Sequence, residues 1–134
     1  MNTKETTTCV EDGCECELVS GKEIYPQIKN LHDTPYWLCR SCFAFIGCFK
    51  PGYGYGDGTR PLGTAANAAT RKAREALQQA FNPIWRTTPI SRRDAFKAMA
   101  KALQIPEDKC RIALFDEATC KAAMSWARKY METR

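Results

Sequence analysis

Histidine is scarce in this sequence, and long hydrophobic runs are missing. His32 is the only histidine, so any catalytic mechanism that needs two imidazoles is excluded. No stretch reaches the roughly 18 consecutive apolar residues that a membrane-spanning helix requires. Residues 1–8 are polar and contain no apolar segment of the kind found in secretory leaders. We therefore expect an intracellular, cytoplasmic protein with no membrane partner.

Cysteine, in contrast, is abundant. The 134 residues include eight cysteines, and 44% of the residues are hydrophobic, which is enough to build the core of one domain. Clustered cysteines in a reducing compartment hold a metal ion more often than they form disulfides. Six of the cysteines fall into two groups and two stand apart: Cys9, Cys14 and Cys16, then Cys39, Cys42 and Cys48, then Cys110 and Cys120.

One pair of cysteines has the spacing of a zinc site. Cys39 and Cys42 form a Cys-x-x-Cys pair, with which a single turn presents two sulfurs to one ion. We predict that Cys9, Cys14, Cys39 and Cys42 hold one structural zinc ion per chain, with Cys16 as the alternative ligand. Four protein ligands close the coordination shell, so a catalytic role for the metal is not expected.

The other cysteines and the histidine favour simpler roles. Buried thiols pack as small apolar groups, and this is the interpretation that competes with metal binding for every cysteine. We expect it to hold for Cys110 and Cys120, and for Cys48, which follows an apolar strand. His32 lies beside Asp33 and is expected in a solvated loop, with metal ligation as the alternative.

The first half of the chain predicts a small β module. Over residues 17–25, two short apolar stretches flank Ser20-Gly21 and predict a β-hairpin, while residues 35–48 predict strand, knuckle and strand. Together these elements predict a zinc-ribbon-like module at 9–50. Residues 1–8 are expected to form a disordered tail, and residues 51–61 a loop rich in glycine and tyrosine.

Residues 62–134 predict a basic helical segment of three helices. Their apolar residues recur at spacings of three and four. The first helix is expected to begin at Leu62 and to end before Pro83, because proline lacks the amide that a helix needs. Ser91 and Asp116 are suitable N-caps for the second and third helices. The expected fold class is therefore α+β, with the β module packed on the helices as one compact domain.

Charge is divided unevenly between the two halves. Residues 1–59 hold five Lys and Arg against eight Asp and Glu, whereas residues 60–134 hold 15 against seven. A basic half of this kind suits an anionic partner. The partner we expect is therefore a nucleic acid or another protein, and no small-molecule substrate is evident.

Three stretches together resemble a known family. They read LVSGKEIYP at 18–26, YWLCRSCFAFIGC at 36–48 and RPLGTAANAATRKAREALQQAFNPIW at 60–85, and the match continues through residues 91–120. They are similar to the zinc-finger-containing domain that is common in phage and prophage proteins. The resemblance covers about residues 9–125. It implies zinc binding, a small α+β fold and a phage context, but no mechanism.

The sequence departs from that family at the first knuckle. Members usually open with Cys-x-x-Cys-Gly, and here Cys9 and Gly13 match the first cysteine and the glycine. Asp12 stands where the second cysteine belongs, so the resemblance makes Cys14 the expected replacement. Relatives often carry a histidine just after the position of Cys48, where this chain has a phenylalanine.

Nucleic-acid binding is the first function that we expect. Clustered cations neutralise phosphates, and aromatic residues in an exposed loop can stack on bases. A solvated, idle charged face is the competing interpretation. The residues concerned are Arg71, Lys72, Arg74, Arg92, Arg93, Lys97 and Lys101, with Tyr53 and Tyr55 in the loop.

A protein-binding phage factor is the alternative. Such a factor would inhibit a host defence or nucleic-acid-processing protein, with the loop tyrosines as contact anchors. An enzyme is not expected, because no nucleophile is paired with a base. The glycines of GYGYG at 52–56 also lack the strand–turn–helix context of a dinucleotide site.

Overall fold

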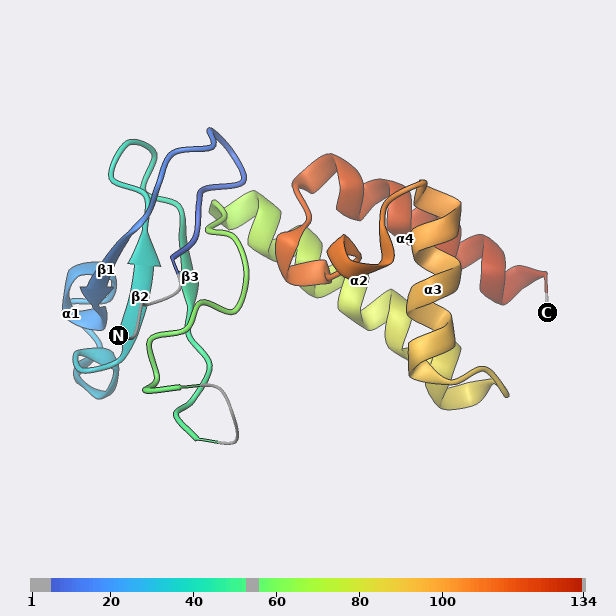
Figure 1. Ribbon diagram of the computed structural model, residues 1–134, viewed down its shortest axis with the longest axis horizontal. Helices are drawn as coiled ribbons and strands as arrows, with labels where there is room; N and C mark the ends of the chain where they lie inside the picture. The colour runs from blue at the N-terminus through green and yellow to red at the C-terminus, as the bar shows by residue number, and fades with distance from the viewer. Residues whose placement is uncertain (1–5, 53–55, 134) are drawn as a thin grey trace. The chain divides into compact units, whose positions relative to one another are not determined.

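The computed structural model describes residues 6–52 and 56–133 and divides the chain into two compact units (Figure 1). We call Met1–Asn67 the N-terminal unit and Ala68–Arg134 the C-terminal unit. The predicted α+β class is confirmed, since the first unit contains the sheet and the second unit is helical. That the two halves form a single domain stays a prediction.

The N-terminal unit is built on a three-stranded antiparallel sheet in the order β1-β2-β3. The strands are β1 (Glu17–Ser20), β2 (Pro35–Leu38) and β3 (Phe45–Gly47). Trp37 in the central strand pairs with Leu18 on one side and Ile46 on the other. Trp37 is buried, because an apolar side chain at the centre of the sheet is shielded by both neighbours. The predicted strand, knuckle and strand over residues 35–48 are confirmed.

The predicted hairpin at 17–25 is wrong in its second half, because the residues after Ser20 do not form a strand. The short helix α1 (Gly21–Ile24) follows β1 directly, and β2 supplies the pairing strand in its place. Gly21 explains the change, because a Cβ atom there would lie 1.8 Å from the carbonyl oxygen of Leu31 in η1 (Lys29–Leu31). The Gly21 amide donates to Thr34 O at 2.7 Å, which ties the turn to the start of β2.

Residues 61–66 pair with the sheet of the N-terminal unit and do not form a helix. The Leu62 amide donates to Gly47 O at 3.0 Å, and the Phe45 amide donates to Ala66 O at 3.2 Å. Ala65 and Ala66 are fully buried. The prediction that the first helix begins at Leu62 is therefore wrong, because this stretch pairs its backbone groups with β3 and with residues 8–10.

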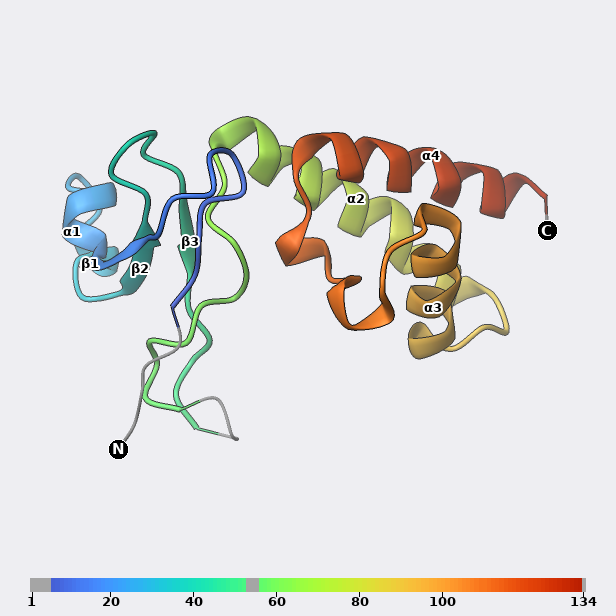
Figure 2. The ribbon, with the colours of Figure 1, turned by 45° about the horizontal axis from the view of Figure 1, so that its top comes forward.

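The C-terminal unit contains the three predicted helices. They are α2 (Ala68–Thr87), α3 (Arg92–Leu103) and α4 (Glu117–Glu132), with η2 (Glu107–Lys109) and η3 (Ile112–Leu114) between the last two. Both views show α2 and α4 side by side (Figures 1 and 2). Alanines at 123 and 127 are buried on α4, and such small side chains let two helices approach closely. No described helix is long and apolar enough to cross a bilayer.

Helix α2 continues past Pro83, where the sequence predicted an end. Phe81 and Ile84, on either side of the proline, are fully buried in the core of the C-terminal unit. Burial of two large apolar side chains offsets the loss of one helical hydrogen bond, because each is worth about 1.5–3 kcal/mol. The Thr87 hydroxyl then donates to Pro83 O at 2.7 Å and ends the helix.

The two predicted N-caps are confirmed. The Asp94 amide donates to Ser91 Oγ at 3.0 Å at the start of α3, and the Thr119 amide donates to Asp116 Oδ1 at 2.8 Å at the start of α4. Each side chain replaces a helical partner that the first turn lacks, which is worth about 1 kcal/mol. Hydrogen bonding by the Thr119 side chain, followed by that of its amide, lowers the pKa of Asp116.

Candidate metal centre

Two loops of the N-terminal unit follow the same backbone course. We call residues 9–14 the first knuckle and residues 39–44 the second knuckle. In the first knuckle, the Cys9 amide donates to Cys14 O at 2.9 Å, and the Gly13 amide donates to Cys9 O at 2.8 Å. In the second knuckle, the Cys39 amide donates to Ala44 O at 2.8 Å, and the Phe43 amide donates to Cys39 O at 2.7 Å. Each knuckle is thus closed by the same two hydrogen bonds.

The two knuckles also share their left-handed residue and their amide directions. Gly13 and Phe43, each fifth in its knuckle, have φ angles of 77° and 65°. In each knuckle, the amides of residues three and four point toward the sulfur of the first cysteine. Amides directed in this way stabilise a thiolate. By position, Asp12 is the counterpart of Cys42.

Four side chains from the two knuckles converge on one point. The ligand atoms of Cys9, Asp12, Cys39 and Cys42 all lie within 4.8 Å of one another. Cys9 Sγ is 3.4 Å from Cys42 Sγ, and Cys39 Sγ is 3.5 Å from Asp12 Oδ2. A tetrahedral zinc ion with ordinary bond lengths separates two sulfurs by about 3.8 Å and a sulfur from an oxygen by about 3.5 Å. The cluster therefore has the size and the donor set of a zinc site.

The Asp12 carboxylate is held in place by the opposite knuckle and by its own. Ser41 Oγ donates to Asp12 Oδ2 at 2.6 Å, and the Cys14 amide donates to Asp12 Oδ1 at 2.9 Å. The Ser41 hydrogen bond, followed by that of the Cys14 amide, holds the pKa of Asp12 well below its usual range. Asp12 is consequently an ionised oxygen donor at neutral pH, which is the form that coordinates zinc.

The thiols around this carboxylate differ in their acidity. Burial raises the pKa of Cys9 to about 12, whereas the Ser41 hydroxyl lowers the pKa of Cys39. Because the thiolate is the metal ligand, zinc has to displace the Cys9 proton on binding. Cys9 and Cys39 are only 2% and 1% exposed, whereas Asp12 and Cys42 are exposed, so the site is buried on one side and open to solvent on the other.

The structure brings three of the four predicted ligands together and replaces the fourth. Cys14 is exposed and lies sixth in its knuckle, where the second knuckle has Ala44. Asp12 stands in its place within the cluster. Cys16, the alternative ligand, packs against the cluster, and burial raises its pKa to about 11. The signal that sequence reasoning passed over was Cys-x-x-Asp-Gly, which places a carboxylate at the ligand position.

The remaining cysteines and the histidine lie outside the cluster. Cys110 and Cys120 are buried in the core of the C-terminal unit, as predicted for packing residues. Cys48 is half-buried, and its pKa is raised by that burial. His32 is half-buried in a turn, where its Nε2 donates to Pro26 O at 2.8 Å.

This fold and this site define a small zinc-binding α+β protein whose two knuckles enclose one metal ion. The chain belongs to the zinc-finger-containing domain family, whose sequence profile matches residues 5–130. No match was found among curated proteins or among solved structures. Family membership and the cluster together support a single structural zinc ion, held by Cys9, Asp12, Cys39 and Cys42.

The predicted basic residues divide into exposed and buried positions. Arg92, Arg93, Lys97 and Lys101 are all exposed on α3, and Lys72 is exposed on α2 while Arg71 is half-buried. Arg74 is only 7% exposed, and its Nε donates to Phe115 O at 2.8 Å. Its assignment to the basic surface is thus wrong, because the guanidinium ties α2 to the start of α4. The predicted stacking residues Tyr53 and Tyr55 lie outside the described residues.

Proposed function

We propose that this chain is a zinc-stabilised module that binds nucleic acid through the basic surface of α3. The supporting observation is that Arg92, Arg93, Lys97 and Lys101 are all exposed on one helix. The helix contains one acidic residue, Asp94, whose amide is bound by the N-cap. Exposed cations at this density neutralise phosphates and release their counterions, which drives binding.

The spacing of these cations suits a phosphate backbone. Arg93, Lys97 and Lys101 are separated by four residues each, so they follow one face of α3 at intervals of about 6 Å. The C-terminal unit also carries most of the basic residues of the chain, whereas the N-terminal unit is acidic. In this proposal the zinc site supplies rigidity, and the helical unit supplies the contact. The protein would act in the cytoplasm of a phage-infected or lysogenic cell.

The proposal is tested by fluorescence anisotropy with the zinc-loaded protein and labelled DNA and RNA. Because several phosphate contacts are involved, affinity is expected to fall by orders of magnitude between about 50 and 200 mM salt. The double variant Arg92→Glu/Arg93→Glu should abolish binding. Arg128→Glu/Lys129→Glu is the matched control, since it reverses two adjacent exposed cations on α4. Equal losses in both double variants would contradict an α3 site.

A protein partner is the second candidate, and one exposed side chain favours it. Phe43 is 54% exposed at the second knuckle, and exposed aromatic residues anchor protein interfaces. As a phage factor, the chain would then occupy and inhibit a host defence or nucleic-acid-processing protein. Stoichiometric capture of one host protein by the wild type, and its loss in Phe43→Ser, would favour this function. Retained capture by Phe43→Ser would argue against this anchor.

A further inference from the structure

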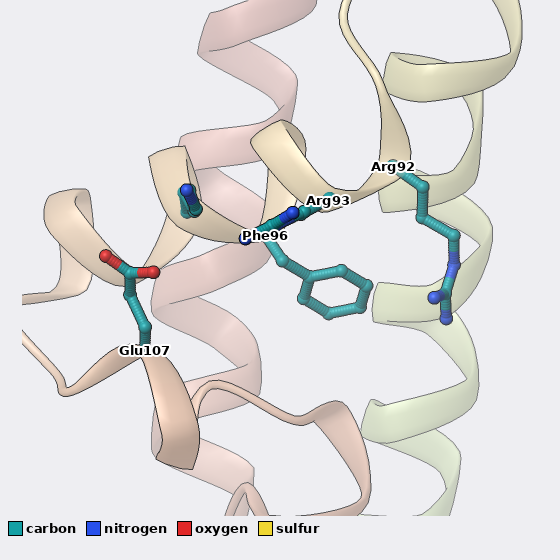
Figure 3. A pocket seen from close by; sticks show the side chains of 5 residues that line it. Arg92, Arg93, Phe96 and Glu107 are labelled. Carbon is teal, nitrogen blue, oxygen red and sulfur yellow. The ribbon is translucent and has the colours of Figure 1, made fainter.

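A groove runs along α3 within the C-terminal unit. Its central part has a volume of about 540 Å³ and is lined by Arg92, Arg93, Phe96 and Lys97 from α3 and by Glu107 from η2. Figure 3 shows the Phe96 ring projecting from α3 between Glu107 and Arg92. A volume of this size accommodates a small organic group rather than a lone ion.

Two further hollows extend the groove at its ends. One, of about 370 Å³, shares Arg92 and Phe96 with the central part and adds Arg111. The other, of about 500 Å³, shares Lys97 and Glu107 and adds Lys101. The exposed cations of α3 thus line three adjoining hollows along one helix, an arrangement that suits an extended chain of repeating charged units.

Two flat groups line the groove side by side, the Arg92 guanidinium and the Phe96 ring, and we call them the Arg92–Phe96 stack. The Arg92 guanidinium lies 4.9 Å from the Phe96 ring and 5.9 Å from the Trp85 ring. Phe96 is held from below by the buried Phe81, at a ring separation of 4.5 Å. Guanidinium and aromatic planes are the surfaces on which nucleic-acid bases stack. Because the Phe96 ring already packs on the core, a base that joins the stack does not have to order this ring.

One acidic side chain interrupts the cations. Glu107 is exposed, and no ion pair joins it to Arg92, Arg93 or Lys97 in the part of the chain that the structure describes. A carboxylate here repels phosphates and the carboxylates of an acidic peptide alike. It would, however, accept a hydrogen bond from the exocyclic amino group of a base. Cations, flat stack and carboxylate together match a nucleotide better than a simple anion.

We infer that this groove binds single-stranded nucleic acid, with phosphates against the α3 cations, a base on the Arg92–Phe96 stack and its amino group on Glu107. The inference rests on the proposed function and names the form of nucleic acid. In a duplex the base faces are stacked and paired inside the helix, so they cannot reach this stack. Single strands leave them free.

The test compares labelled oligodeoxycytidine, oligodeoxythymidine and a duplex of the same length at about 50 mM salt. Arg92→Lys keeps the positive charge but removes the planar group. It should weaken single-strand binding about tenfold, the size of one lost base stack, and change duplex binding less than twofold. Phe96→Leu should behave in the same way, provided that its circular dichroism and Tm match the wild type.

A second variant makes the test independent of the core contact of Phe96. Cytosine offers an amino donor and thymine does not, so the wild type should prefer oligodeoxycytidine. Glu107→Ala should tighten both complexes, because a repulsive charge is removed, and should erase the preference. Lys129→Gln on α4 is the control for charge loss, and it should preserve both the preference and the single-strand selectivity.

Different failures point to different claims. If α3 charge reversal abolishes binding but Arg92→Lys and Glu107→Ala leave the strand and base preferences unchanged, the groove inference is overturned and the proposed function stands. If neither strand nor duplex binds at low salt, both claims are overturned.

Discussion

The two knuckles share one backbone and differ in chemistry. Residues 9–14 and 39–44 are closed by the same pair of hydrogen bonds and turn through a left-handed fifth residue. The second knuckle presents two thiols, whereas the first presents a thiol and the Asp12 carboxylate. The backbone therefore fixes where a ligand atom must be, and the side chain at that place can be sulfur or oxygen. The comparison also explains why Cys14 does not join the cluster, since its position lies past the ligand positions of the knuckle.

The fifth residue is a second difference between the knuckles. Gly13 adopts a positive φ without steric cost, whereas Phe43 adopts it with its Cβ close to the backbone. A bulky side chain in this conformation is a genuine outlier. The first knuckle thus has a carboxylate where the second has a thiol, and the second has a phenylalanine where the first has the glycine that a left-handed turn favours.

Removal of a ligand from the second knuckle should have the largest effect. Cys42→Ser takes one thiolate from the site, and a structural zinc ion contributes on the order of 10 kcal/mol to folding. The variant should lose most of its bound zinc and the dispersed NMR signals of the N-terminal unit. Cys14→Ser is the matched control and should retain both, because Cys14 is exposed outside the cluster. Similar zinc loss in the two variants would restore Cys14 as a ligand.

Acidification should weaken zinc binding through the thiols and not through Asp12. Burial raises the pKa of Cys9 to about 12, so this thiol is protonated in the metal-free chain throughout the neutral range. Each proton displaced lowers the affinity about tenfold for every pH unit that the pH falls. Three protonated thiols set an upper limit of about a thousandfold per unit. Asp12, whose pKa is held low by Ser41, should add nothing above the acid range.

This pH dependence is measured by competition with a chelator at several pH values. In Asp12→Cys the added thiol should steepen the dependence by up to one further proton. An unchanged slope in Asp12→Cys would show that residue 12 does not contact the metal.

Conversion of the first knuckle into a copy of the second should strengthen zinc binding. Asp12→Cys replaces a hard oxygen donor by a soft thiolate, which zinc favours when the ligand positions are already set. We expect affinity to rise by about tenfold or more at neutral pH, and Asp12→Ala to lower it. In the cobalt-substituted protein, the sulfur-to-metal charge-transfer absorption should increase by about one third, from three thiolates to four. Equal absorption in both proteins would mean that a fourth thiol, such as Cys16, already coordinates the ion.

Exchange of the fifth residues should have the smallest effect. Phe43→Gly relieves the left-handed conformation and should stabilise the zinc-loaded protein by about 1 kcal/mol, since Phe43 is exposed and loses little packing. Gly13→Ala should destabilise it by a similar amount, because open space around Gly13 leaves only the backbone cost. Both values follow from denaturant midpoints in excess zinc. Destabilisation by Phe43→Gly would indicate that the ring makes a stabilising contact.

The parts of the fold that follow from local chemistry were predictable. The Cys39/Cys42 pair, both N-caps and the three helices depend on neighbours in sequence, and the structure confirms them. The arm after Gly21 was not predictable, because its conformation depends on the carbonyl of Leu31, ten residues away. Pro83 was misjudged for a similar reason. The helix continues because Ile84 is buried in the core, and the local sequence does not show which residues tertiary packing will bury.

The site was predictable in number and position but not in ligand identity. The spacing of the cysteines favours a fourth thiolate, and Cys14 is the nearest one available. The deciding fact is the alignment of two knuckle backbones, which places Asp12 opposite Cys39 and under the Ser41 hydroxyl. The burial of Arg74 was likewise not visible in the local sequence. Its side chain is buried against Phe115 O, although its sequence neighbours Arg71 and Lys72 are more exposed.

Because residues 61–66 are hydrogen-bonded beside both knuckles, their amides should report whether zinc is bound, although none of these residues is a ligand. The Ala65 amide donates to Thr8 O at 3.0 Å, one residue before Cys9, and the Ala66 amide donates to Phe45 O at 3.2 Å, one residue after Ala44. Each bond thus fastens this stretch to one knuckle. When zinc leaves and the knuckles loosen, these two amides should exchange with deuterium long before the helical core does. The exchange rates of the Ala65 and Ala66 amides would then report how long zinc stays bound.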